Sequence, residues 1–178
     1  MAVRKVVTGH DEAGHSIFLS DNPVDPVETQ FMPGFQTFEL WSTTDNRQVP
    51  HRGSSHGVSN YFPGTDDSVF RVITFPALAQ GQAAMEITEP AVLELQRKLP
   101  GLIEHMELDA PGMHTTDSVD YGIVLQGEIY LELDNGDERL LSAGDCVVQN
   151  GTRHAWHNRS GAPVVMAFVL LGADRISE

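Results

Sequence analysis

Hydrophobic and polar positions alternate along much of this chain with a period of two residues, which is the period of a β-strand. Residues 128–133 alternate strictly between apolar and polar side chains, and residues 35–41 show the same half-buried pattern. Residues 68–75 and 164–171 are rich in β-branched, aromatic and aliphatic side chains, which also favours strands. The pattern therefore predicts a chain built mainly of β-strands.

Turn residues divide these segments into short strands. Residues 3–7 and 16–19 are expected to pair as an N-terminal hairpin, and residues 21–30, which hold two prolines, are expected to be a connection. Asn135-Gly136 predicts a tight hairpin turn, because this pair accepts the positive φ angles of a type I′ turn. Short strands separated by such turns predict an all-β sandwich or barrel.

Residues 89–99 form the one clear helical pattern. Thr88 is expected to cap this helix, and Val92, Leu95 and Leu99 form an apolar stripe along it. The helix is an insertion in a β chain, and it either covers a pocket as a lid or packs on the outside of a barrel. We favour the second interpretation.

Loop and strand assignments are less distinct in the middle of the chain. Residues 43–55 are expected to be a loop that carries His51, with His56 beside it. Residues 57–61 are expected to form a short strand, and the pattern of residues 81–87 is ambiguous.

Composition limits the partners of the protein. The chain has 178 residues, enough for one domain with a real core, and 25 acidic against 11 basic side chains give a net charge of −14. Such a field repels phosphate groups, so neither nucleic acid nor an anionic membrane is an expected partner. The single cysteine, Cys146, allows no internal disulfide, and no apolar leader or membrane span is visible, so a cytoplasmic location is expected.

Residues 111–158 resemble the two motifs of the cupin superfamily. Its first motif has a histidine, a second histidine two residues on, a glutamate four beyond that and a glycine seven further on; those places hold His114, Thr116, Asp120 and Gly127. Its second motif runs from a glycine through Pro-x-Gly to a histidine and an asparagine; the matching residues are Gly144, Gln149, Asn150, Gly151, His154 and Asn158.

The resemblance implies a double-stranded β-helix, or jelly-roll barrel, that often forms a homodimer and holds a ligand pocket inside the barrel. It implies a single cupin domain over residues 1–178, with N-terminal strands in 1–80, the helical insertion in 82–106 and the motif core in 107–172. The family's metal site of three histidines and one glutamate is altered, because Thr116 replaces a histidine and Asp120 replaces the glutamate.

The remaining candidates still make a recognisable ligand set. The family places His114 and His154 inward, and with Asp120 they would give two imidazoles and one carboxylate, the set of non-haem Fe(II) oxygenases. The same set would serve Zn, Mn or Ni as a Lewis acid. Such a centre implies an oxygenase-like enzyme acting on a small aromatic or carbonyl-bearing molecule.

Two alternatives need no metal. The same His114, His154 and Asp120 could perform acid–base catalysis in an isomerase, cyclase or lyase, or could hold a small molecule without turning it over. The barrel could also be a dimerisation module with a vestigial pocket.

Four neighbours of the motif residues are expected to line the pocket. Strand alternation puts Trp156 on the same face as His154, where it is either a pocket wall or part of the core. Thr116 belongs to the pocket, while Met113 and Glu107 are expected at its mouth. The same alternation turns Tyr121 and His157 to the opposite face.

Overall fold

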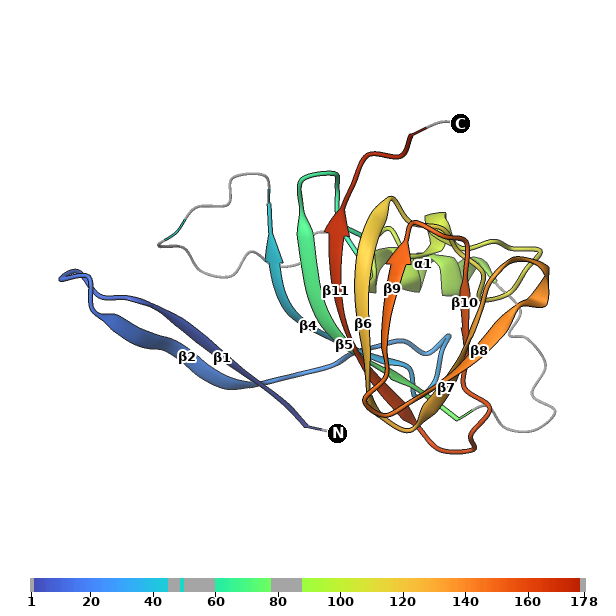
Figure 1. The fold of residues 1–178 in the computed structure, drawn as a ribbon, viewed down its shortest axis with the longest axis horizontal. Helices are drawn as coiled ribbons and strands as arrows, with labels where there is room; N and C mark the ends of the chain where they lie inside the picture. The colour runs from blue at the N-terminus through green and yellow to red at the C-terminus, as the bar shows by residue number, and fades with distance from the viewer. Residues whose placement is uncertain (1, 45–48, 50–59, 78–87, 177–178) are drawn as a thin grey trace.

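The computed structural model of the protein describes residues 2–44, 49, 60–77 and 88–176. The predictions for His51, His56 and residues 57–59 and 81–87 lie outside these ranges. In the described part, β-strands dominate and there is one α-helix, so the predicted all-β barrel with one helical insertion is confirmed (Figure 1). No described helix has both the length and the apolar character needed to cross a membrane.

Six strands form the larger sheet. In spatial order they are β3 (Val27–Glu28), β4 (Gln36–Thr43), β5 (Ser68–Phe75), β11 (Val164–Gly172), β6 (Ser118–Gln126) and β9 (Cys146–Asn150). Every pairing in this sheet is antiparallel. The sheet confirms the strands predicted at 35–41, 68–75 and 164–171, with small changes at the ends.

Three strands form the smaller sheet, in the order β10 (Ala155–His157), β7 (Glu128–Glu132) and β8 (Glu138–Ser142). Between β7 and β8 lies the short helical turn η2 (Asp134–Gly136), where Asn135 and Gly136 have φ angles of 62° and 71°. Both angles are positive, as the prediction for this hairpin requires.

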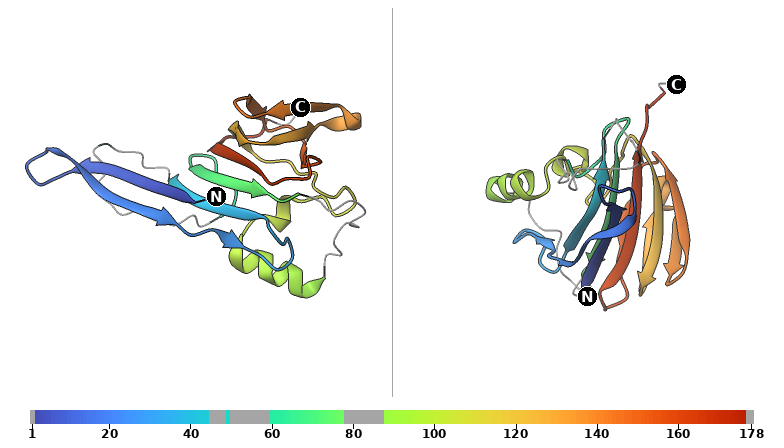
Figure 2. Two further views of the ribbon diagram at one scale, coloured as in Figure 1. Left: turned by 90° about the horizontal axis from the view of Figure 1, so that it is seen from below. Right: turned by 90° about the vertical axis from the view of Figure 1, so that its left-hand side faces the viewer.

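The N-terminal hairpin is a separate two-stranded ribbon of β1 (Val3–His10) and β2 (Ser16–Val24). It extends away from the barrel (Figures 1 and 2). The prediction that residues 21–30 are a connection is wrong for its first part, because β2 continues to Val24. Pro23 is tolerated there because a two-stranded ribbon leaves alternate N–H groups without a strand partner.

The main core lies between the two sheets. Its buried members include Val69 of β5, Ile129 of β7, and Met166 and Phe168 of β11. Both sheets therefore bury their inner faces against each other, which is the closed arrangement that the alternating pattern predicts.

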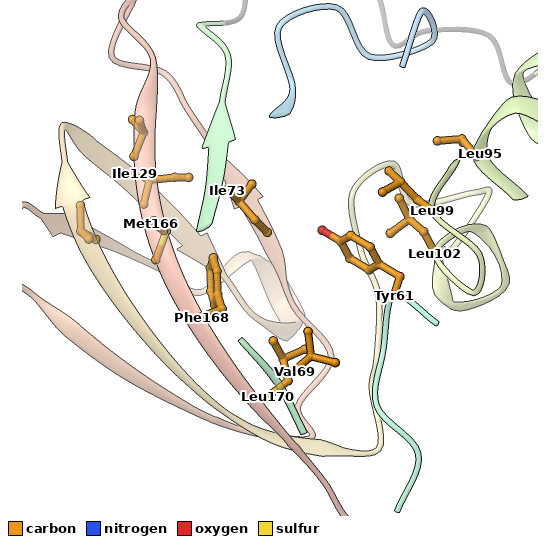
Figure 3. Close-up of a cluster of buried hydrophobic side chains, with 12 residues drawn as sticks. Tyr61, Val69, Ile73, Leu95, Leu99, Leu102, Ile129, Met166, Phe168 and Leu170 are labelled. Carbon is orange, nitrogen blue, oxygen red and sulfur yellow. The ribbon is translucent and has the colours of Figure 1, made fainter. Parts of the chain in front are cut away.

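Helix α1 (Glu89–Lys98) and the short η1 (Ile103–His105) close one side of this core. Leu95, Leu99 and Leu102 belong to the same cluster as the barrel interior, and Tyr61 lies between them and the strands (Figure 3). The helix therefore packs its apolar stripe against the barrel from one side, and whether it also acts as a lid stays a prediction. Thr88 occupies the predicted N-cap position, but its side chain makes no capping hydrogen bond.

Candidate functional site

His114 and His154 lie opposite each other in the barrel, just before β6 and β10. They form an isolated antiparallel bridge, in which each backbone N–H donates to the other's carbonyl at 3.0 Å. Their ring centroids are 4.2 Å apart. His154 is 3% exposed, and His114 is half-buried. Two segments 40 residues apart in sequence thus bring the two predicted imidazoles together.

The tautomer of both rings follows from a shared local contact. Nδ1 of His114 lies 3.0 Å from the carbonyl oxygen of Gly112, and Nδ1 of His154 lies 2.9 Å from that of Thr152. A carbonyl oxygen only accepts, so each Nδ1 must carry a proton and donate it. In the neutral ring this leaves the lone pair on Nε2, which is the arrangement that metal-binding histidines usually have.

Burial keeps these rings uncharged. Desolvation, together with the charge of the neighbouring His114, lowers the pKa of His154 to about 4. Desolvation is also the main cause that lowers the pKa of His114. Both imidazoles are therefore neutral at pH 7, the form that coordinates a metal or accepts a proton.

Aromatic rings flank the two imidazoles. Phe62 stacks on His114 with ring centroids 6.0 Å apart, and Trp156 meets His154 edge-on at 5.9 Å. Trp156 also contacts the core residue Phe168 at 5.6 Å. Trp156 therefore has the neighbours expected of a core residue as well as those expected of a pocket wall.

The carboxylate of Glu107 is held in place by the guanidinium of Arg153. Arg153 donates to both of its carboxylate oxygens, from Nε at 2.7 Å and from Nη2 at 2.6 Å. These hydrogen bonds lower the pKa of Glu107, and its charge in turn raises that of His114. The electrostatic link supports the predicted place of Glu107 near the histidines. Met113, whose carbonyl accepts from the Glu107 N–H at 2.9 Å, is buried.

Asp120 faces the barrel interior and is only 6% exposed. Desolvation raises its pKa to about 6, against a hydrogen bond from Ser118 and the charge of Arg71, which lower it. Thr116 is also buried and accepts from Ser118 Oγ at 3.0 Å. Both candidates from the first motif are therefore inside the barrel, and Tyr121 points outward, as alternation predicts.

Among the described residues, one group of three metal-ligating side chains has its ligand atoms within 4.8 Å of one another, and it consists of Glu132, Glu138 and His157. Its members already have partners, since His157 Nε2 lies 2.5 Å from Glu132 and Arg159 bridges both oxygens of Glu138. Asp120 forms no such group with His114 and His154 in this part of the chain, so its role as a third ligand stays a prediction.

Two residues that belong to this region were not predicted as site residues. His105 in η1 lies 4.7 Å from the Phe62 ring, and its charge lowers the pKa of His114. No periodic pattern marks a residue in so short a turn. Arg71 lies on the inner face of β5 and is 1% exposed. Here a signal existed, because a charged residue in a predicted buried strand needs a buried partner.

Similarity to known proteins bears on the family of this chain. The sequence model of the family described as "Cupin domain" matches residues 104–170. The phomopsin biosynthesis cluster protein C′ of Diaporthe leptostromiformis is 32% identical over 97% of this chain and 79% of its own length. The cupin-domain-containing oxidoreductase fogC of Aspergillus ruber is 29% identical over 96% of this chain and 72% of its own.

Among solved structures, the cupin domain of Schizosaccharomyces pombe Cnp3 superimposes with a TM-score of 0.48 at 9% identity, covering 95% of this chain and 87% of that one. A putative ethanolamine utilization protein of Salmonella typhimurium gives a TM-score of 0.44 at 10% identity, covering 98% and 99% of the two chains.

Proposed function

This chain belongs to the cupin superfamily, and we propose that it is an enzyme that acts on a small molecule at the His114–His154 pair. Relatives similar over nearly the whole chain include a protein named a cupin-domain-containing oxidoreductase and one named for a biosynthesis cluster. These names support an oxidoreductase of a biosynthetic pathway. That its substrate is a small aromatic or carbonyl-bearing molecule is our proposal.

The observation that carries the proposal is a pair of neutral imidazoles that share the same tautomer, with the proton on Nδ1. Each Nδ1 is tied to a backbone carbonyl, so both Nε2 lone pairs remain for a ligand. The two imidazoles fit one divalent ion, and the proposal adds Asp120 as the third ligand, which would have to move toward them because its carboxylate forms no close group with both rings among the described residues. Bound there, Fe, Zn, Mn or Ni would supply Lewis-acid chemistry, and Fe would also supply oxygenation.

The protein's own side chains would position the substrate. Phe62, stacked on His114, and Trp156, edge-on to His154, surround the imidazoles with aromatic rings, which suits a planar ring or an enolisable carbonyl compound. The low exposure of His154 keeps bulk water from the reacting atoms.

Elemental analysis tests this proposal. We expect about one divalent ion per chain in the purified protein and its loss in the His114→Ala/His154→Ala double variant. His157→Ala is the matched control, because it removes a histidine from the Glu132–Glu138 group instead. A metal that persists in the double variant, or a protein that stays metal-free after anaerobic Fe(II) and Zn(II) loading, would refute the metal centre.

One observation favours a second candidate function without metal. A carboxyl group with a pKa of about 6, as in Asp120, exchanges its proton close to neutrality. An isomerase, cyclase or lyase would use such a group. This candidate is supported if turnover persists after a chelator removes metal ions and is lost in Asp120→Asn. If the protein binds a small molecule but does not turn it over, it is a binder and not an enzyme.

We also propose that the protein is a homodimer. Phe70, Tyr121, Ile123 and Val148 are 41%, 48%, 42% and 56% exposed on the outer face of β5, β6 and β9. The outward positions of β6 and β9 carry no charge, in a chain whose net charge is −14. An apolar sheet face of this kind is expected to be covered by a second copy of itself.

Light scattering after size exclusion tests the dimer. Tyr121→Glu is expected to give a monomer, and Leu93→Glu, on an equally exposed apolar site of α1, is expected to leave the dimer intact. A wild-type monomer at micromolar concentration would refute this interface. It would also leave the alternative of a dimerisation module with a vestigial pocket without support.

A cytoplasmic location is part of the proposal, because the one cysteine cannot form an internal disulfide.

A further inference from the structure

The C-terminal segment after β11 lies against the segment that follows His114. Strand β11 ends at Gly172, and the next N–H, that of Ala173, donates to the Asp117 carbonyl at 2.9 Å. Arg175 Nε donates to Asp117 Oδ1 at 2.5 Å. One backbone contact and one side-chain contact therefore hold Arg175 close to the first of the two segments that carry the candidate histidines.

The backbone ladder between these two segments is interrupted. The last pair of the β6–β9 ladder is Val119 with Asn150, and the next backbone pair is the bridge between the two histidines. Five residue steps lead from Val119 to the first histidine, whereas four lead from Asn150 to the second, so one segment holds an extra residue. Among the described residues, no backbone hydrogen bond joins 115–117 to 152–153. The two segments therefore separate, as at a β-bulge, just before they meet again at the imidazoles.

The guanidinium of Arg175 lies in this gap. Its Nη2 donates to the Thr116 carbonyl at 2.9 Å and to the Gly151 carbonyl at 3.1 Å. Nη2 carries two N–H groups, so one atom serves both acceptors. One carbonyl lies two residues after His114, and the other lies three residues before His154. Arg175 therefore ties both histidine-bearing segments to one cation.

The three groups meet in one small space. Gly151 has a φ angle of 60°, and a Cβ added there would lie 3.2 Å from Arg175 Nη2 and 3.2 Å from the Thr116 carbonyl oxygen. These distances are shorter than ordinary van der Waals contacts, so a side chain at this position would press on both groups. The cation therefore lies directly against the turn that leads into His154.

This gap is accessible to solvent. The Arg175 side chain is 47% exposed, and a cavity of about 210 Å³ beside it is lined by Thr116, Asn150 and Gly151 among others. If the side chain were removed, water would hydrogen-bond each carbonyl without holding the two together. We therefore expect the loss of Arg175 to change the spacing of the segments more than the stability of the fold.

We propose that Arg175 is a positioning residue that sets the spacing of His114 and His154. Its charge-assisted hydrogen bonds hold together two carbonyl dipoles that would otherwise repel each other across the gap. The imidazoles follow, because each is oriented by a carbonyl of its own segment and the segments meet at the bridge. This inference rests on the proposed function, since the imidazole pair is the proposed metal site.

Hydrogen exchange in metal-free protein tests this spacing. The backbone N–H groups of His114 and His154 donate to each other's carbonyls, so their exchange reports the opening of the bridge. We expect Arg175→Ala to raise both exchange rates by about tenfold and to leave the amides of β5 and β11 unchanged. Arg139→Ala is the matched control, because this exposed guanidinium pairs with Asp137 on β8's side of the barrel. Unchanged rates at the bridge, or an equal rise over the whole barrel, would overturn the assignment.

A second variant covers the case in which Arg175→Ala does not fold. Arg175→Lys keeps the charge but loses the fork of donors, and we expect it to raise the exchange rates at the bridge by about threefold. Wild-type rates in Arg175→Lys would contradict the role of the fork.

Chemical rescue separates positioning from a general effect on folding. At millimolar concentration, ethylguanidinium supplies Arg175→Ala with the missing fork of donors, and ethylammonium supplies the same charge without it. We expect ethylguanidinium, and not ethylammonium, to return the exchange rates at the bridge toward those of the wild type. Rescue by neither ion, or by both equally, would contradict the role of the guanidinium.

Zn(II) titration gives a separate result for the metal centre. We expect Arg175→Ala to weaken the Kd for Zn(II) by about tenfold, because groups that orient metal ligands affect affinity on this scale, and Arg139→Ala to leave it unchanged. Equal affinity in wild type and Arg175→Ala would overturn the role of Arg175 and leave the metal centre standing. A wild type that binds no Zn(II) would count against the metal centre, and hydrogen exchange would still decide the role of Arg175.

Discussion

Asp120→Asn is expected to change how the stability of this protein depends on pH. The carboxyl group is 6% exposed, and desolvation raises its pKa from 3.8 to about 6. The fold therefore favours the protonated form, which is the opposite of what a surface ion pair does to an aspartate. Asparagine has nearly the same shape and cannot ionise, so it removes the titration and leaves most of the packing.

The magnitude follows from the shift. Below pH 3.8 the carboxyl is protonated in both the folded and the unfolded state, and the stability linked to its protonation is fully present. As pH rises toward 6, the unfolded chain ionises first, and this contribution is lost until the folded carboxyl ionises as well. A shift of about two pKa units corresponds to about 3 kcal/mol, so the wild type should lose about that much relative to Asp120→Asn between pH 4 and pH 8.

Urea unfolding at pH 4, 6 and 8 measures this difference. Far-ultraviolet circular dichroism follows the transition, and a chelator keeps metal from binding the carboxylate. Asp109→Asn, at an exposed position in the loop before His114, is the matched control. Identical pH profiles for wild type and Asp120→Asn would show that the carboxyl is not desolvated. A variant that becomes less stable than wild type as pH rises would show that Arg71 stabilises the charge more than burial opposes it.

Three further outcomes follow from individual contacts. Asn158→Ala should destabilise the fold by about 3 to 5 kcal/mol in urea unfolding. The reason is that the buried side-chain amide donates to three backbone carbonyls and accepts from Ser160. Asn158→Asp should not restore the stability, because its carboxylate would face those carbonyls. Gly172→Ala should lower the free energy of unfolding by about 3 kcal/mol or prevent folding, because a Cβ there would lie 1.7 Å from the Gly64 carbonyl oxygen. The control Gly161→Ala has open space around its Cβ and should lower the free energy of unfolding by about 1 kcal/mol, because of its positive φ alone. His154 should show its ring proton on Nδ1 and titrate near pH 4 in nitrogen–proton correlation NMR of metal-free protein, and a midpoint near 6.5 would contradict its burial.

Much of the fold could be predicted because burial in a sheet repeats every second residue. Strand β5 occupies the residues that its β-branched and aromatic content marks, and the Asn135-Gly136 turn has the backbone angles that this pair permits. The extent of β2 could not be predicted in the same way. Pro23 argues against a strand inside a sheet, but β2 belongs to a ribbon with only one partner.

The candidate site could also be predicted only in part. The resemblance to cupins pointed to His114, His154 and Asp120, but the sequence did not settle whether Asp120 faces inward, which its burial in the structure shows. The contacts that decide the chemistry are not periodic: each imidazole is oriented by a carbonyl two residues earlier, in a turn whose geometry the local sequence does not fix. Arg71 meets Glu39 and Tyr61 from different segments, and no pattern within one strand predicts such a meeting.

Burial affects the two imidazoles and the Arg71 guanidinium in opposite ways. The imidazoles respond by losing their charge, because their ordinary pKa is close to neutrality. Arg71 cannot respond in this way, since a guanidinium stays protonated, so its charge must be matched by Glu39, by the Tyr61 ring and by whatever occupies its unpaired donors. A divalent ion on the imidazoles would add the positive charge that they gave up, and ionised Asp120 is the interior group available to offset it. Metal uptake and ionisation of Asp120 should therefore be coupled, with binding strengthening as pH rises through about 6.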